Sequence, residues 1–573
     1  MWLINVETMR LEDFTVRPAP QYAILSHTWS EEEVSLQEFT CQNADTVKKE
    51  GFAKIVRTCS LAAENHIKYA WVDTCCIDKS SSAELTEAIN SMFQWYKNAV
   101  VCYAYLSDLS PRQDAVTRDQ KVNVSRRGYS LASRNELQGC KWFTRGWTLQ
   151  ELIAPKAVRF YDKTWDFRGT KHDLAVPIES ITHIDDAALR GSKTLADIAI
   201  ARRMAWASKR KTTRVEDVAY CLLGIFDVNM PLLYGEGNKA FTRLQEEIIK
   251  NSSDLSIFGW SPEERFISVS YRPESYVGCE FDCGHGDDNE DAFYSILATS
   301  PSEFLTTHPY NIVQSVEHSV TNRGIKIYCS LLEICLAGCK FVQCKCCGDN
   351  RKYVLVIGNV TDVGLFILGI QESYWSWGVV LDKISPDVFI RSRKPVILGY
   401  WSKSSSEHTR SRAIYLLTQA PKSARHATLP LIIREGSDFI IQSAAPAEKW
   451  NSCKRFWYVE DGFDMWGMVS LKFDDLASFR DRGVSILVFS HNVYVLDPRV
   501  YGAEIRLISQ AGSNLDWGDI REIFDFESLP SGRLKVMDRK LKVMARFVDK
   551  FSHHESLEVW TEDIESDGRP ARA

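Results

Sequence analysis

Residues 68–106 read KYAWVDTCCIDKSSSAELTEAINSMFQWYKNAVVCYAYL, and the order of segments in this stretch decides the fold of the first third of the chain. An apolar, strand-like segment at 68–73 is followed by a helical pattern and then by a second apolar segment at 99–106. Ser81 and Glu84 have the spacing of a capping box, which marks a helix start. An apolar stripe with helical periodicity follows, made of Leu85, Ala88, Ile89, Met92, Trp95 and Tyr96. Strand, helix and strand in this order predict an α/β layout with a mainly parallel sheet.

The same alternation extends outward on both sides. Further strands are predicted at residues 21–27 and 158–161, and a helix is predicted at about 46–66, where apolar residues recur near every 3.6 positions. A short helix at about 144–153 should end before Pro155, because the residue preceding a proline is pushed out of helical geometry. These elements predict an α/β domain over residues 1–165.

The pattern changes twice along the rest of the chain. Residues 195–251 have helical periodicity, so we expect a helical connecting segment at 166–257. Beyond it, short apolar runs between turn residues predict an all-β domain at 258–573. Two of these runs are DVGLFILGI at 362–370 and VYVLDP at 493–498. If the boundary is a linker, limited proteolysis should cut near residues 252–264.

Composition narrows the classes of protein to consider. A chain of 573 residues exceeds one ordinary core, so we expect two or three domains. A net charge of -6 lacks the basic excess that nucleic-acid binding needs, so no nucleic-acid partner is expected. The sequence contains neither a signal-peptide pattern nor an apolar run long enough for a membrane span, and the cytoplasm is the expected location. The 16 cysteines are interpreted as small apolar residues in a reducing compartment.

Three sequence blocks resemble the HET (heterokaryon incompatibility) domain family of fungi. They are YAILSHTW at 22–29, WVDTCCIDK at 71–79 and WFTRGWTLQELIAP at 142–155. The resemblance covers about residues 1–165, and LLGIFDVNMPLLYGEGNKAFTRLQEEII is similar to the segment that follows HET domains in related proteins. It implies a role in fungal non-self recognition and programmed cell death, a form of innate immunity.

HET domains in turn resemble TIR domains, which are flavodoxin-like modules of immune and cell-death signalling. Here ELTEAINSM is similar to the second TIR helix, and WTLQEL is similar to the Trp-Cys-Leu-Asp-Glu-Leu type of sequence on the third. The resemblance implies that Glu151 stands where NAD-cleaving TIR domains have their catalytic glutamate. It also implies self-association, with NAD as a substrate and no bound cofactor.

The candidate ligand residues follow from the predicted sheet, because doubly wound sheets bind ligands beyond the carboxyl ends of their strands. A carboxylate there could stabilise the positive charge that develops on ribose when the nicotinamide bond breaks. We therefore select Glu151 as the catalytic candidate, with an ordinary structural glutamate as the alternative. The binding candidates at this edge are Ser26, His27, Trp29, Asp73, Asp78 and Trp147.

Other interpretations stay open at this point. His27 and Asp78 also suit loop and capping roles. Cys75 and Cys76 beside His27 raise a cysteine hydrolase as an alternative enzyme. The cysteines at 335, 339, 344, 346 and 347 lie in a strand-turn-strand pattern and are interpreted as strand residues, so no metal site is predicted. The main alternative to an enzyme is a non-enzymatic assembly module that works with an incompatibility partner protein.

Overall fold

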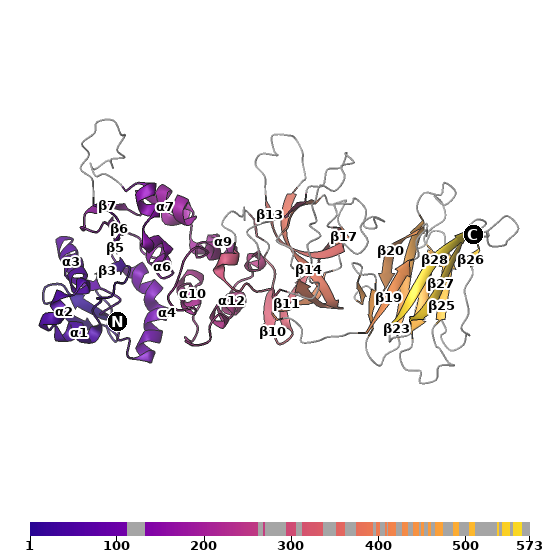
Figure 1. The fold of residues 1–573 in the computed structure, drawn as a ribbon, viewed down its shortest axis with the longest axis horizontal. Coiled ribbons are helices and arrows are strands. Elements are labelled where there is room, and N and C mark those ends of the chain that lie inside the picture. The colour runs from indigo at the N-terminus through magenta and orange to yellow at the C-terminus, as the bar shows by residue number, and fades with distance from the viewer. Residues whose placement is uncertain are drawn as a thin grey trace, which may run out of the picture. The chain divides into compact units, whose positions relative to one another are not determined.

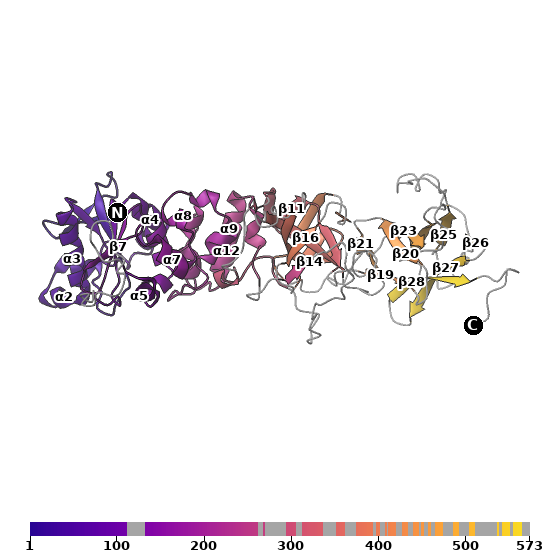
Figure 2. The ribbon, with the colours of Figure 1, turned by 90° about the horizontal axis from the view of Figure 1, so that it is seen from above.

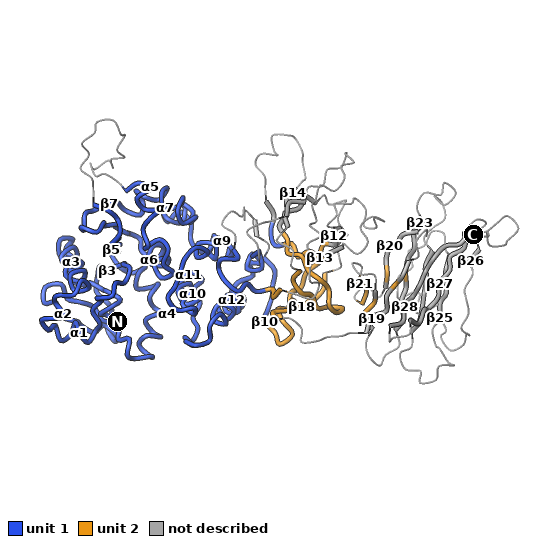
Figure 3. The backbone as a smooth tube through the Cα atoms, viewed as in Figure 1, with its two compact units in different colours: residues 1–266, 297–320, 357–360 blue, residues 267–296, 321–356, 361–573 orange. Residues whose placement is uncertain are grey.

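The computed structural model gives the fold of two compact units (Figure 3). Unit 1 comprises Met1–Phe266, Leu297–Val320 and Ile357–Val360, and unit 2 comprises Ile267–Ile296, Thr321–Val356 and Thr361–Ala573. The structure describes residues 1–111, 132–261, 267–269, 294–304, 312–313, 315–335, 351–360, 374–392, 397–401, 407–408, 411–419, 427–433, 439–445, 449–451, 456–459, 465–473, 485–491, 504–509, 536–537, 541–550 and 554–563.

Unit 1 is built on a mixed seven-stranded sheet with the order β2-β1-β4-β3-β5-β6-β7. Its four central strands are parallel: β4 (Tyr69–Trp71), β3 (Tyr22–His27), β5 (Val101–Tyr105) and β6 (Val158–Tyr161). Antiparallel strands complete both edges, with β1 (Trp2–Asn5) and β2 (Arg10–Asp13) beside β4 and β7 (Phe167–Thr170) beside β6. Every residue of β3 and β5 is buried, as expected for parallel strands covered on both faces.

Helices cover the two faces of this sheet (Figures 1 and 2). On one face, Leu61 and Ala62 of α3 (Glu50–Glu64) pack in one cluster with Ala23 of β3 and Tyr103 of β5. The opposite face carries α4 (Ser82–Asn98), whose Tyr96 hydroxyl donates to the Leu25 carbonyl at 2.9 Å, and α6 (Thr148–Ile153). The sheet is therefore the middle layer of three.

Further short helices complete the first part of unit 1 and the connecting region. The α-helices are α1 (Leu36–Cys41), α2 (Ala44–Lys48), α5 (Arg134–Gln138), α7 (Ala175–Thr182), α8 (Asp186–Leu189), α9 (Ile200–Ala205), α10 (Asp217–Tyr220), α11 (Leu223–Phe226) and α12 (Lys239–Asn251). The 3-10 helices are η1 (Lys141–Thr144), η2 (Leu195–Asp197), η3 (Leu255–Phe258) and η4 (Pro301–Glu303). Gln245 of α12 exchanges two hydrogen bonds with the backbone of Ala298, which joins the later segment to unit 1.

The elements that the structure describes after η4 are strands. They are β9 (Ile312–Val313) and β10 (His318–Thr321), then β11 (Gly324–Cys329), β12 (Leu332–Cys335), β13 (Arg351–Val360), β14 (Tyr374–Ser385), β15 (Val388–Arg391), β16 (Ile397–Trp401), β17 (Glu407–His408), β18 (Arg412–Leu416), β19 (Ala427–Ile433), β20 (Phe439–Ala445), β21 (Trp450–Asn451), β22 (Phe456–Val459), β23 (Met465–Phe473), β24 (Ser485–His491), β25 (Glu504–Ser509), β26 (Val536–Met537), β27 (Leu541–Lys550) and β28 (His554–Asp563). β8 (Ile267–Val269) precedes η4 in the chain and pairs with β16. Most neighbours are antiparallel, as in β23 with β24 and β27 with β28.

The sequence predictions agree with these elements in the centre of the first sheet. The structure confirms an α/β N-terminal region and a later β-sheet region, although the first sheet is mixed rather than mainly parallel because β1, β2 and β7 add antiparallel edges. The helix predicted at 46–66 is two helices, since Lys49 is extended between α2 and α3. The predicted boundaries at 165 and 257 stay predictions, and the runs at 362–370 and 493–498 lie outside the described residues.

The proteolysis site at residues 252–264 stays a prediction, and the structure shows which part of it is buried. Residues 255–261 are buried, and the Ser256 hydroxyl accepts a hydrogen bond from the Ala201 backbone N–H at 3.0 Å. Asp254 accepts another from Ile200 at 2.8 Å. Because a protease needs exposed and locally unfolded backbone, residues 255–261 are protected, whereas Ser253 is exposed.

Candidate functional site

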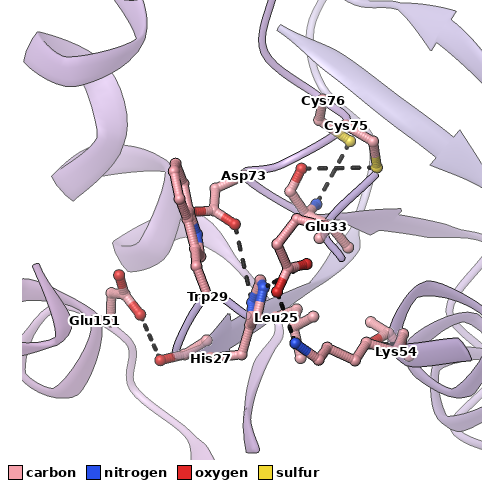
Figure 4. Close-up of polar contacts among 12 residues, drawn as sticks. Leu25, His27, Trp29, Glu33, Lys54, Asp73, Cys75, Cys76 and Glu151 are labelled. Carbon is pink, nitrogen blue, oxygen red and sulfur yellow. Dashed lines mark hydrogen bonds and ion pairs between the residues drawn. The ribbon is translucent and has the colours of Figure 1, made fainter. Parts of the chain in front are cut away.

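Glu151 lies inside unit 1, on helix α6, against the end of strand β3. Its side chain is 5% exposed, and Oε2 accepts a hydrogen bond from the Ser26 hydroxyl at 2.5 Å (Figure 4). The Ser26 oxygen in turn accepts a hydrogen bond from the indole N–H of Trp142 at 2.8 Å. These three residues form a buried chain of hydrogen bonds from η1 through β3 to α6.

The surroundings of Glu151 favour its neutral form. Burial raises its pKa, and the nearby negative charge of Asp73 raises it further. Ser26, Tyr96 and the positive charge of Arg210 lower it, but the net result is a pKa of about 8. At neutral pH the closed site therefore holds a glutamic acid, and a carboxylate forms here only at a cost.

A second polar group lies on the other face of the sheet, around His27. The His27 Nε2 atom lies 3.4 Å from Glu33 Oε2, and Nδ1 lies 3.9 Å from Asp73 Oδ1. Neither ring nitrogen makes a hydrogen bond within the described part of the chain. Glu33 also pairs with the buried Lys54 of α3 at 2.6 Å (Figure 4). A histidine is thus enclosed between two carboxylates.

The charge on Glu33 is maintained by its neighbours. Burial raises its pKa, but His27, Lys54 and the backbone of Ser30 outweigh that effect, so the pKa lies far below the usual range. Gly51 of α3 allows this arrangement. Its N–H donates to the Glu32 carbonyl oxygen at 3.0 Å, and a Cβ at position 51 would lie only 2.7 Å from that oxygen. The close approach brings the loop that carries Glu33 onto α3.

Ser26 and His27 are neighbours in sequence but belong to different groups. Successive side chains of a strand point to opposite faces of the sheet. Ser26 contacts Glu151 on the α6 side, whereas His27 faces Glu33 and Lys54 on the α3 side. Asp73, which follows β4, is the link, since it neighbours His27 and also acts electrostatically on Glu151.

An exposed aromatic ring lies beside these groups. Trp29 is 55% exposed, and its indole N–H donates to Asp73 Oδ2 at 2.8 Å. The Lys79 ammonium group lies 3.7 Å from the centre of the Trp29 ring. Asp73 and Lys79 therefore fix an aromatic surface and a positive charge at the carboxyl edge of the sheet, where a ring and an anionic group could bind together.

The other two binding candidates have different partners. Asp78 accepts hydrogen bonds from Ser80 and from Gln37, at 2.6 Å and 2.8 Å for their side chains, which is turn chemistry. Trp147 precedes α6 and hydrogen-bonds to Asp217. Burial raises the pKa of Asp217, and the hydrogen bond from Trp147 offsets part of that rise. Neither residue is brought into contact with Glu151 by these interactions.

The cysteine hydrolase alternative receives no support from the geometry of Cys75 and Cys76. Both side chains are buried and interact with the backbone of Val72. The Cys75 thiol donates to the Val72 carbonyl, and the Cys76 sulfur accepts from the Val72 N–H. Burial raises the pKa of Cys75 well above its usual value, which keeps the thiol protonated and unreactive. The imidazole of His27 has carboxylates as its polar neighbours instead.

Other features of the described residues lie apart from this edge. No group of three or more His, Cys, Asp or Glu side chains among them is arranged to hold a metal ion. None of the described helices is long and apolar enough to cross a membrane. A groove of about 840 Å³ lies at the amino-terminal ends of β3 and β5, opposite the edge that carries the candidates. Its lining includes Met1, Phe14, Tyr22, Trp95, Lys97 and Lys156. Of the cysteines predicted in a strand-turn-strand pattern, Cys335 ends β12 and those at 339–347 lie outside the described residues.

Four polar partners of the site were not predicted from sequence: Glu33, Lys54, Trp142 and Arg210. Trp142 opens the third family-like block, so its place in that block was a usable signal. Glu33 and Lys54 are 21 residues apart in sequence, and Arg210 is far from α6 along the chain. Such non-local pairs leave no periodic pattern in the sequence.

Comparisons with known proteins match two segments of the chain to family models. Residues 22–151 match the family model described as heterokaryon incompatibility protein (HET), and residues 239–328 match a domain of unknown function, DUF8212. The chain is 48% identical over 240 residues to vegetative incompatibility protein HET-E-1 of Podospora anserina. That match covers 41% of this chain but 17% of the fungal protein. No solved structure matches the chain.

Proposed function

We propose that the protein, whose residues 22–151 match the HET family model, is a fungal heterokaryon incompatibility effector whose HET domain cleaves NAD when it is clustered. Cell death would follow from loss of NAD. The similarity to a vegetative incompatibility protein supports the biological role. The cytoplasm is the proposed site of action, with copies of the same chain and an incompatibility protein as partners.

The sheet order supports a TIR-like, flavodoxin-like fold for this domain. Numbered along the chain, the four parallel strands have the spatial order 2-1-3-4, which is the beginning of the flavodoxin-like order. In that arrangement, ligands bind at the carboxyl ends of the first and third strands, where the order reverses. Ser26 and His27 end β3, and the Ser107 hydroxyl after β5 lies 3.4 Å from that of Thr28.

The observation that carries the proposal is the buried Ser26–Glu151 pair at this switch point. Bond cleavage between nicotinamide and ribose leaves an oxocarbenium-like sugar, which a carboxylate stabilises. The ionised carboxylate of Glu151 would stabilise the positive charge on the sugar, while the Ser26 hydroxyl donates a hydrogen bond to one carboxylate oxygen. Trp29 would stack on an aromatic ring of the substrate, and Lys79 would attract its phosphates. His27 and Asp73 would keep the edge of the sheet ordered and charged.

A non-enzymatic assembly module is the second candidate, and one observation favours it. Glu151 is only 5% exposed, so in this closed arrangement the carboxyl group serves a structural hydrogen bond to Ser26. In the catalytic proposal, clustering has to open the site. In the assembly proposal, Glu151 stays buried throughout and killing proceeds without NAD loss.

The experiment compares the full chain with Glu151→Gln, which has the same shape and lacks the ionisable group. Each protein is fused to an inducible oligomerisation domain, and NAD, free nicotinamide and cell survival are followed after clustering. Glu64→Gln makes the same chemical change at an exposed position of α3 and serves as the matched control. We expect nicotinamide release and killing by the wild type and Glu64→Gln, and neither by Glu151→Gln.

Thermal unfolding of each variant separates chemistry from folding. Loss of activity in a Glu151→Gln protein of normal stability supports catalysis. Full NAD loss with folded Glu151→Gln rejects the catalytic role of Glu151. Killing by the wild type without NAD loss rejects the enzymatic proposal and favours the assembly module.

A further inference from the structure

We propose that Arg210 is a positioning residue of the Glu151 site, so that the working unit of the HET domain extends beyond residue 151 to include residues 199–226. The catalytic part of this inference rests on the proposed function. Its structural part concerns Glu151 itself and is tested without reference to NAD. The family match ends at Glu151, so nothing in it assigns a role to the later segment.

The backbone of this segment holds the loop that leads into α6. The Lys211 N–H donates to the Thr144 carbonyl at 2.7 Å, and the Gly146 N–H donates to the Lys211 carbonyl at 2.9 Å. Arg145 and Lys211 form a parallel β-bridge between these bonds. The loop between η1 and α6 is thus paired with a strand-like stretch from the connecting region.

Arg210 adds side-chain contacts at the start of α6. Its Nη1 atom donates to the Arg145 carbonyl at 2.8 Å and to the Thr148 hydroxyl at 3.0 Å. The Thr148 hydroxyl donates in turn to the Trp142 carbonyl at 2.5 Å. Because Trp142 donates to Ser26 and Ser26 to Glu151, one guanidinium group supports both ends of the buried chain. The helix has no side-chain cap of its own at Trp147, so this support matters more.

The fit between the segment and the site loop leaves no spare volume. A Cβ on Gly146 would lie 2.5 Å from the Thr212 methyl group and 3.2 Å from the Cys221 sulfur. A Cβ on Gly224 of α11 would lie 2.1 Å from Cβ of Phe93 on α4. Glycine at these two positions permits direct packing of the segment on the elements around Glu151.

Arg210 also acts on Glu151 through its charge. Burial lowers the pKa of Arg210 to about 10 against the raising effects of Cys221 and Glu151, so the group stays positive at neutral pH. That charge opposes the effects of burial and Asp73 on Glu151. The Nη2 atom of Arg210 is buried and makes no hydrogen bond to any described residue, which leaves a donor for a carboxylate that ionises nearby.

Arg203 provides a matched control in the same segment. It also carries a guanidinium group that is partly buried, with a pKa lowered by burial to about 10, and it donates to the backbone carbonyls of Ile198 and Ile225. The positive charge that lowers the pKa of Glu151 is that of Arg210. If Arg210 only packed the segment, replacing either arginine would affect Glu151 equally. If Arg210 positions the site, only its replacement affects Glu151.

The test measures the protonation of Glu151 in the full chain by infrared spectroscopy, taking the carboxylic-acid band that Glu151→Gln abolishes. We expect Arg210→Met to raise the midpoint of this band by about one pH unit, the lower end of what loss of a nearby opposite charge does. Arg203→Met should leave the midpoint unchanged. If Arg210→Met fails to fold, Arg210→Gln and Arg203→Gln replace the pair, since glutamine removes the charge but keeps an amide that can donate hydrogen bonds.

The outcomes separate this inference from the proposed function. A midpoint shift in the Arg210 variant alone supports the positioning role, and equal shifts or no shift in the two variants overturn it. With clustered wild type as reference, the pH profile of NAD cleavage should move with the infrared midpoint. A shifted midpoint together with inactive wild type would reject NAD cleavage and leave the positioning of Glu151 intact.

Discussion

The pKa of Glu151 predicts that raising the pH destabilises the wild-type protein relative to Glu151→Gln. In the unfolded chain this carboxyl titrates near its ordinary value of 4.5, and in the folded protein near 8. Between these values the folded state binds one more proton than the unfolded state, so the free energy of unfolding falls as pH rises. The stabilisation by the neutral acid is complete below pH 4.5 and is lost as pH passes through about 8.

The size of the effect follows from linkage. One bound proton changes the free energy of unfolding by about 1.4 kcal/mol per pH unit. From pH 5.5 to 7.5 the wild type should therefore lose roughly 2–3 kcal/mol relative to Glu151→Gln, which has no proton to lose at this position. Titrating groups that do not interact with Glu151 behave alike in the two proteins, and their contributions cancel in the difference.

The assay is urea unfolding of both full-length proteins at a series of pH values. Unfolding is monitored by hydrogen exchange of the amides in β3 and α6. Exchange reports on unit 1 directly, which matters because a chain with two compact units need not unfold in one step. A stability difference that is constant from pH 5.5 to 7.5 would refute a raised pKa at Glu151.

Three further predictions follow from individual contacts. Gly51→Ala should cost roughly 1–3 kcal/mol of unfolding free energy because its Cβ would lie 2.7 Å from Glu32 O, whereas Gly139→Ala, with no heavy atom within 4 Å, should be close to neutral in the same denaturant titration. Cys75 and Cys76 should react with a thiol reagent only after denaturation, whereas the exposed Cys41 should react in the native protein; fast native labelling of Cys75 would contradict its burial. Asp73→Asn should lower the infrared midpoint of Glu151, because Asp73 raises that pKa, and an unchanged midpoint would show that the two carboxyl groups do not interact.

The central elements were predictable because their signals are local. Strands β3 and β5 are buried throughout and β6 is buried at three of its four residues, with mostly apolar side chains, and the predicted limits of β6 are those observed. Helix α4 was predicted from its apolar stripe and from Ser81, whose side chain accepts from the Glu84 N–H. The reciprocal half of the capping box is absent, since Glu84 accepts from the Asp78 N–H instead. In the folded chain the Glu84 carboxylate therefore stabilises the turn before the helix and not the helix start itself.

The edge strands and the site partners were harder to predict for physical reasons. β1, β2 and β7 have four residues each and are only partly buried, so they lack a long apolar pattern. The grouping of Ser26 with His27 followed from their common place at a strand end. Strand alternation separates them, and the structure assigns each to a different face. The contacts of Glu33 with Lys54 and of Arg210 with Thr148 depend on chain folding over long separations.

Access, more than ionisation, separates the two functional hypotheses. With a pKa of about 8, roughly one tenth of Glu151 is ionised at pH 7, so forming the carboxylate in the closed site costs only about 1.4 kcal/mol. Clustering could supply that amount through a few contacts. A side chain that is 5% exposed, however, cannot meet a substrate the size of NAD until the cover around α6 moves. Catalysis therefore requires that clustering uncovers Glu151 while residues 210–211 still hold the loop that leads into α6, whereas an assembly module requires that Glu151 stays buried.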